Sequence, residues 1–142
     1  MGRGAKFWDL KSFECIARLN NNNLFVHSFT FLGSKIISGS EDTTIKIWSL
    51  EEFVKLTTLN DHKDSVNNIK FINNGTKFAS ASADDTIRFW DVFTGEFISK
   101  TKQNKSVLSL AVMSNGDLVS TSEDKTIKIW DTDLFYNISS VF

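Results

Sequence analysis

The sequence predicts an all-β fold made of repeated four-stranded antiparallel units. Four tryptophans, at positions 8, 48, 90 and 130, are separated by 40, 42 and 40 residues. Closely similar stretches lead into three of them and read SGSEDTTIKIW, SASADDTIRFW and STSEDKTIKIW. Self-similarity at a fixed period indicates a repeat architecture, in which each repeat is one supersecondary unit. Short strand-like segments alternate with turn residues inside each repeat, which is not a helical pattern.

The middle repeat shows the four expected strands in order. Apolar residues at Val66, Ile69 and Phe71 predict the first strand, and a turn follows at 73–75 because Asn and Gly tolerate positive φ. Small residues dominate the second strand, which suits a crowded position near a central axis. The third strand is rich in β-branched and aromatic residues. The predicted strands are 66–71, 78–82, 86–90 and 97–100.

Three of the tryptophans are followed by aspartate, as Trp8-Asp9, Trp90-Asp91 and Trp130-Asp131, whereas Ser49 follows Trp48. With this dipeptide and the repeat period, essentially the whole chain resembles the WD-repeat family. The resemblance implies a β-propeller, in which four-stranded blades are arranged radially around a channel. We therefore expect a partial propeller, with a half blade and three full blades at residues 6–19, 24–59, 65–101 and 106–142.

The expected number of blades bears on how a ring could form. Propellers close with about 4 to 8 blades, and this chain supplies three and a half. We interpret the chain as a fragment of a larger propeller, in which further blades or a second copy of the chain complete the circle.

The resemblance also implies a buried hydrogen-bond relay in each blade. Its members are a histidine before the first strand, a serine or threonine in the second, an aspartate in the next turn, and the tryptophan. The middle blade offers all four as His62, Ser80, Asp84 and Trp90. The outer blades offer three each, with Asn22 and Gln103 at the histidine position: Ser38, Asp42 and Trp48, then Ser120, Asp124 and Trp130.

The same polar residues could suggest catalysis or metal binding. The aspartates recur one per blade, whereas a catalytic pair needs two carboxylates converging on one cleft. No cysteine or second histidine stands at metal-ligand spacing from His62, and the repeated serines lack a nucleophile elbow. We therefore expect no catalytic residue, no metal and no cofactor. Lys46, Arg88 and Lys128 recur in the third strand, and we expect their charged ends to reach water.

Charge and composition indicate the compartment and exclude two classes of partner. A formal net charge of −1 weighs against a nucleic-acid binder, whose affinity comes from neutralising phosphates. No apolar run approaches the roughly 20 residues of a membrane helix, and a secretory signal is absent from residues 1–10. The single cysteine, Cys15, favours a reducing compartment. We expect the cytoplasm, with the nucleus as the alternative.

These observations predict a non-catalytic scaffold or adaptor that binds proteins or peptides. Blade loops are free to vary, and the resemblance implies that the loops before the relay aspartates and before the first strands share one face. Mixed charge on that face suits a protein partner. The expected partner-binding residues are Glu41, Lys63, Asp64, Ala83, Asn104, Lys105 and Glu123.

Two alternatives remain at this point. The chain could be the propeller portion of a larger enzyme, or a substrate adaptor of a ubiquitin ligase. Some family members that serve as such adaptors carry an arginine two residues after the Trp-Asp dipeptide. Phe93 and Asp133 occupy that place here, which weakens the adaptor hypothesis.

Overall fold

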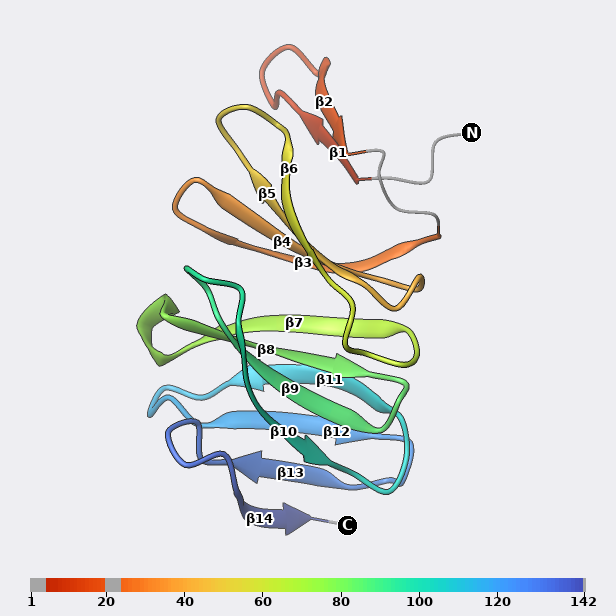
Figure 1. Ribbon diagram of the computed structural model, residues 1–142, viewed down its shortest axis with the longest axis vertical. Helices are drawn as coiled ribbons and strands as arrows, with labels where there is room; N and C mark the ends of the chain where they lie inside the picture. The colour runs from red at the N-terminus through yellow and green to blue at the C-terminus, as the bar shows by residue number, and fades with distance from the viewer. Residues whose placement is uncertain (1–4, 20–23, 142) are drawn as a thin grey trace.

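The computed structural model describes residues 5–19 and 24–141, which form strands joined by short turns (Figure 1). A two-stranded sheet comes first, and we call it the half blade. It contains β1 (Ala5–Trp8) and β2 (Cys15–Leu19). Three four-stranded antiparallel sheets follow, which we call the first, middle and last blades. The only helix among the described residues is the 3-10 turn η1 (Asn73–Gly75), so the all-β prediction is confirmed.

Each blade is a meander in which consecutive strands pair. The first blade contains β3 (Val26–Leu32), β4 (Lys35–Ser40), β5 (Ile45–Ser49) and β6 (Lys55–Leu59). The middle blade contains β7 (Val66–Ile72), β8 (Lys77–Ser82), β9 (Thr86–Asp91) and β10 (Phe97–Lys102). The last blade contains β11 (Val107–Val112), β12 (Leu118–Ser122), β13 (Ile127–Trp130) and β14 (Asn137–Val141).

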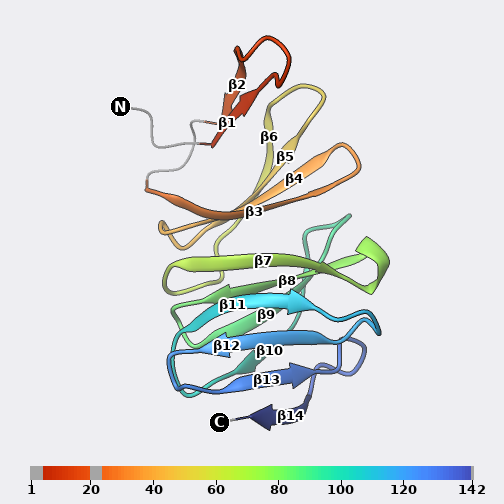
Figure 2. The ribbon, with the colours of Figure 1, turned by 180° about the vertical axis from the view of Figure 1, so that it is seen from behind.

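The blades stack face to face, and the middle blade lies between the other two (Figure 2). Its inner strand β7 packs against both β3 and β11. Two polar contacts tie these strands together: Asn67 Nδ2 donates to the carbonyl oxygen of Val107 at 2.8 Å, and the Ile69 N–H donates to Ser28 Oγ at 3.1 Å. The core is therefore a series of layers between blades.

Each layer joins the tryptophan-bearing face of one blade to the opposite face of the blade before it. Between the first and middle blades, Ile37, Ile45 and Ile47 meet Ile69 and Trp90. Between the middle and last blades, Ala81, Ile87 and Phe89 take the equivalent place. Burial of these faces supplies the hydrophobic stabilisation that a single four-stranded sheet lacks.

The turn after the Trp-Asp dipeptide explains why aspartate stands there. Asp91 Oδ1 accepts the backbone N–H groups of Phe93 and Thr94, both at 2.8 Å. Asp9 and Asp131 accept equivalent pairs of N–H groups in their own turns. These bonds satisfy backbone donors that would otherwise stay unpaired in a tight turn.

The fifth residue after the tryptophan has a left-handed backbone in every unit. The φ angle is 72° at Gly95, and it lies between 54° and 59° at Phe13, Phe53 and Phe135. Two of these rings pack on the preceding unit, with centroid distances of 5.6 Å from Phe53 to Phe7 and 4.6 Å from Phe135 to Phe89. Contact with the neighbouring unit thus accompanies an unfavourable backbone conformation.

Candidate functional site

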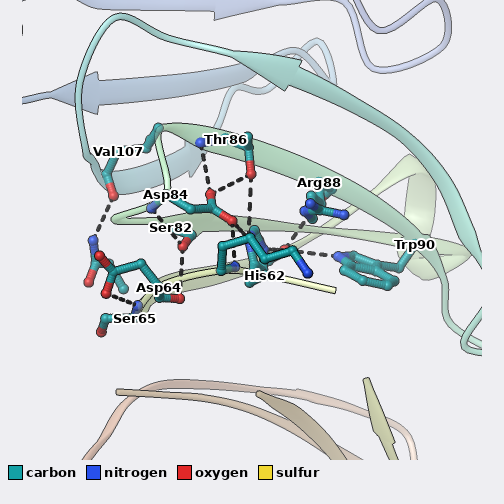
Figure 3. A network of polar contacts seen from close by, with 12 residues as sticks. His62, Asp64, Ser65, Ser82, Asp84, Thr86, Arg88, Trp90 and Val107 are labelled. Atoms are coloured by element: carbon teal, nitrogen blue, oxygen red, sulfur yellow. Dashed lines mark hydrogen bonds and ion pairs between the residues drawn. The ribbon is translucent and has the colours of Figure 1, made fainter. Parts of the chain in front are cut away.

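The relay of the middle blade is a continuous chain of four side chains (Figure 3). Trp90 Nε1 donates to Ser80 Oγ at 2.9 Å, and Ser80 Oγ lies 2.7 Å from His62 Nε2. His62 Nδ1 lies 2.8 Å from Asp84 Oδ2. Figure 3 shows the His62 ring between Asp84 and the indole of Trp90. Because a carboxylate only accepts, Nδ1 carries a proton, and in the neutral ring Nε2 accepts the hydroxyl proton of Ser80.

Asp84 is the most heavily bonded member of this relay. Thr86 donates to Oδ1 through its hydroxyl at 2.5 Å and its backbone N–H at 3.0 Å. The Lys63 N–H donates to Oδ2 at 3.0 Å. Burial alone raises the pKa of Asp84, but the hydrogen bonds from His62, Thr86 and Lys63 outweigh burial and hold that pKa well below its ordinary value of 3.8. Asp84 is therefore an ionised structural acceptor at neutral pH.

In the first blade a lysine, Lys46, pairs with the relay aspartate Asp42. Trp48 Nε1 donates to Ser38 Oγ at 2.9 Å, as in the middle blade. Lys46 Nζ lies 3.1 Å from Asp42 Oδ2 and donates to Thr44 Oγ1 at 2.6 Å. Asn22, the residue expected at the histidine position, lies outside the described residues.

The prediction that the Lys46 ammonium reaches water is therefore wrong. Side chains alternate along a strand, so Lys46 and Thr44 point to the same side of the chain. The stem of Lys46 then reaches back four residues to Asp42, and the ion pair satisfies both buried charges. The side chain of Lys128 also turns inward, with Nζ 4.0 Å from Asp124 Oδ2.

In the last blade the relay stops at the glutamine. Trp130 Nε1 donates to Ser120 Oγ at 2.8 Å, and Gln103 Nε2 donates to the same oxygen at 2.5 Å. Gln103 Oε1 and Asp124 Oδ2 are buried without a hydrogen-bond partner at normal distance. The hydroxyl of Thr126 is the main cause of the lowered pKa of Asp124. The glutamine thus reaches the serine but does not bridge to the aspartate.

A second serine in each blade was missed as a structural residue, although the repeated stretches contain it. These serines, two residues after the relay serine, each donate to a carbonyl oxygen in the loop before the first strand. Each also accepts the N–H of the relay aspartate, at 3.1–3.2 Å. The pairs are Ser40 with Phe25 at 2.9 Å, Ser82 with Asp64 at 3.0 Å, and Ser122 with Lys105 at 3.0 Å.

A backbone bond repeats beside each of these serines. The N–H of the residue before the relay aspartate donates to the loop that leads into the first strand. The distances are 2.9 Å for Glu41 to Phe25, 2.9 Å for Ala83 to Ser65, and 3.0 Å for Glu123 to Ser106. Both loops of each blade are therefore fixed to each other.

The predicted partner-binding residues lie in these paired loops, along the right-hand edge of the blades in Figure 1. We call them the loop face. Ala83 is half-buried, and the side chains of the other six are exposed. Within the described residues, none of its charged side chains belongs to an ion pair. The loop-face residues are Glu41, Lys63, Asp64, Ala83, Asn104, Lys105 and Glu123.

Residues 5–19 and 24–141 contain neither a cluster of metal ligands nor a membrane-spanning helix. No group of three histidine, cysteine or acidic side chains in these ranges could hold a metal ion. No helix in the same ranges is long and apolar enough to span a bilayer.

The repeated relay, the capped turns and the stacked meanders define a WD-repeat protein. Residues 13–49, 53–91 and 95–131 match the family described as WD domain, G-beta repeat, and the chain belongs to this family.

Curated relatives are similar over most of the chain but are much longer. The chain is 26% identical to the U3 small nucleolar RNA-associated protein 15 homolog of Xenopus tropicalis, over 89% of the chain and 25% of the relative. It is 36% identical to the apoptotic protease-activating factor 1 of Rattus norvegicus, over 75% of the chain and 8% of the relative. The Xenopus laevis counterpart of the first relative is 24% identical over the same shares.

Proposed function

We propose that this chain is a non-catalytic protein-interaction module whose partners dock on the loop face. The observation that carries this proposal is the set of serine and backbone bonds repeated in all three blades. They hold the backbone of the paired loops while the side chains of Glu41, Lys63 and Lys105 stay exposed. A surface that is ordered before binding loses less conformational entropy when a partner arrives.

The charges of the loop face favour a protein or peptide over a nucleic acid. Glu41, Asp64 and Glu123 stand among Lys63 and Lys105, so acidic and basic groups are interspersed. Phosphate recognition requires clustered positive charge, whereas mixed charge selects a complementary protein surface.

The curated relatives bear on the kind of assembly and the compartment in which we propose that the module works. The chain spans a quarter or less of each relative's length, so we propose that it acts as one interaction module of a multicomponent assembly. The cytoplasm remains the proposed compartment, and the name of the first relative makes a nucleolar assembly the alternative. A propeller portion of a larger enzyme and a ubiquitin-ligase adaptor are the competing roles.

The test compares the proteins that co-purify with wild type and with a Glu41→Lys, Glu123→Lys double variant. Glu52→Lys is the matched control, because Glu52 is exposed in the turn between β5 and β6, at the opposite edge of the blade. We expect the double variant to lose partners that the control keeps. Equal losses from both variants, or no losses, would refute the loop face as the docking site. Filter binding to RNA tests the expectation that nucleic acids are not partners. Tight binding at physiological salt would overturn that expectation.

A further inference from the structure

Among the strands that the structure describes, none pairs with the outer edge of β1. β1 pairs with β2 on one side, and no other described strand lies in its sheet. Trp8 is 53% exposed and its indole donates no hydrogen bond to a described residue, whereas Trp48, Trp90 and Trp130 are at most 3% exposed. Each of those three indoles donates to a serine of the adjacent second strand, at 2.8–2.9 Å. Trp8 therefore presents an indole N–H without the serine partner that the corresponding tryptophan has in each full blade.

The face of the first blade that lies toward the half blade is also incompletely covered. Phe29 of β3 is 55% exposed, although its equivalents Ile69 and Leu110 are 0% and 3% exposed. The second strand of the preceding blade covers those equivalents. A Cβ added at Gly39 of β4 would lie only 3.1 Å from Ile69 Cδ1. A second strand beside β1 would cover Phe29 in the same way.

We propose that the open edge of β1 binds an extended strand of a partner, in antiparallel pairing, that carries a serine followed by glycine or alanine. The serine hydroxyl accepts the Trp8 indole N–H, and the small residue after it fits against Phe29. The chain contains this pattern in its own second strands, as Ser38-Gly39 and Ser80-Ala81. Strand addition of this kind takes affinity from main-chain bonds and specificity from alternate side chains. The inference deepens the proposed interaction function but uses a surface separate from the loop face.

The backbone N–H and C=O groups of β1 are also placed to pair with such a strand. The backbone oxygen of Lys46 accepts the hydroxyl of Ser38 at 3.4 Å, and the backbone oxygen of Arg88 lies 3.5 Å from Ser80 Oγ. Both residues stand two positions before the tryptophan, as Lys6 does in β1. The N–H and C=O of one strand residue point to the same side of an antiparallel pair. The backbone of Lys6 therefore faces the open edge.

The probe for this site is a peptide of residues 61–85, the β7–β8 hairpin, which carries Ser80 and Ala81. Calorimetric titration of the full chain with this peptide should show one-to-one binding. Trp8→Phe removes the N–H but keeps an aromatic ring, and should weaken binding about fivefold. Peptide with Ser80→Ala should weaken binding to wild type equally, and should weaken binding to the Trp8→Phe chain no further.

Two more variants separate strand addition from other modes of binding. Lys6→Pro should abolish binding while leaving the fold intact, because proline is tolerated where an edge N–H faces solvent. Ile138→Thr on β14, another exposed edge strand, should bind like wild type, as should the loop-face variant Glu41→Lys. Circular dichroism verifies that each variant keeps its strands.

Three results would overturn the proposal. The first is no binding at millimolar peptide, and the second is equal binding by wild type and the Lys6→Pro chain. The third is an effect of Ser80→Ala that is the same with Trp8 present or replaced. A Glu41→Lys chain that loses cellular partners but still binds the peptide would leave the two proposals separately supported.

Discussion

Lys46 Nζ lies 3.1 Å from Asp42 Oδ2, and these side chains are only 6% and 9% exposed. In the middle blade the equivalent aspartate, Asp84, meets His62 at 2.8 Å instead. One blade therefore buries an ion pair at the position where its neighbour buries a histidine relay. A buried ion pair adds little net stability, but it leaves a costly unpaired charge when one member is removed.

The first prediction follows from this ion pair. Asp42→Asn should lower the free energy of unfolding by about 3 kcal/mol, because the Lys46 ammonium is left buried without its carboxylate. Adding Lys46→Met should recover most of the loss. Urea unfolding of the single and double variants measures both effects. If the double variant is no more stable than Asp42→Asn alone, the ion pair is not the cause.

The second prediction concerns the incomplete relay of the last blade. Gln103→His should raise the midpoint of thermal unfolding, because an imidazole can bond both Ser120 and Asp124. It also removes the buried, unpaired Gln103 Oε1, whose burial costs about 1–3 kcal/mol. The reverse change in the middle blade, His62→Gln, should lower the midpoint. An unchanged or lower midpoint in the Gln103→His chain would contradict the prediction.

The third prediction is a loss of stability in acid that depends on Asp84. The pKa of Asp84 is lower in the folded chain than its ordinary value of 3.8, so the unfolded chain binds more protons as the pH falls below about 4. The contribution of Asp84 is complete above that pH and declines as the pH falls toward the folded pKa.

Asp84→Asn should therefore flatten the dependence of unfolding free energy on pH between about pH 5 and pH 3. Urea titrations at several pH values give that slope. The slope should not vanish, because the pKa values of Asp9, Asp91 and Asp124 are also lowered. A slope identical to wild type would show that Asp84 contributes nothing to acid sensitivity.

The fourth prediction compares two phenylalanines with the same backbone conformation. Phe13 and Phe135 both have φ near 60°, but Phe13 is 78% exposed while the Phe135 ring packs on Phe89. Phe13→Gly should stabilise the chain by about 0.5–1 kcal/mol, because glycine adopts positive φ without a steric cost. Phe135→Gly should destabilise it, because the aromatic contact is lost. Effects of the same sign on the unfolding free energy would refute this comparison.

The repeat period and the turn residues were enough to predict the fold, because each blade repeats one pattern of strand and turn. The histidine-to-aspartate contact in the middle blade was implied by the resemblance to the WD-repeat family. The inward turn of Lys46 was not predicted. A lysine in a strand is expected to extend its ammonium into water, and only the structure shows that Asp42, four residues earlier, lies within reach of it. The exposure of Trp8 agrees with the half blade expected from the sequence at residues 6–19, which has no second strand to cover this residue.

The layered core has a consequence for the order in which the chain opens. Each blade contacts only its immediate neighbours, so the units resemble sites of a one-dimensional array. Of the blades that the structure describes, the middle one alone is covered by a full blade on both sides. We therefore expect fraying to start in the outer units and move inward, so that amide hydrogens of β8 and β9 exchange with deuterium more slowly than those of β1, β2 or β14.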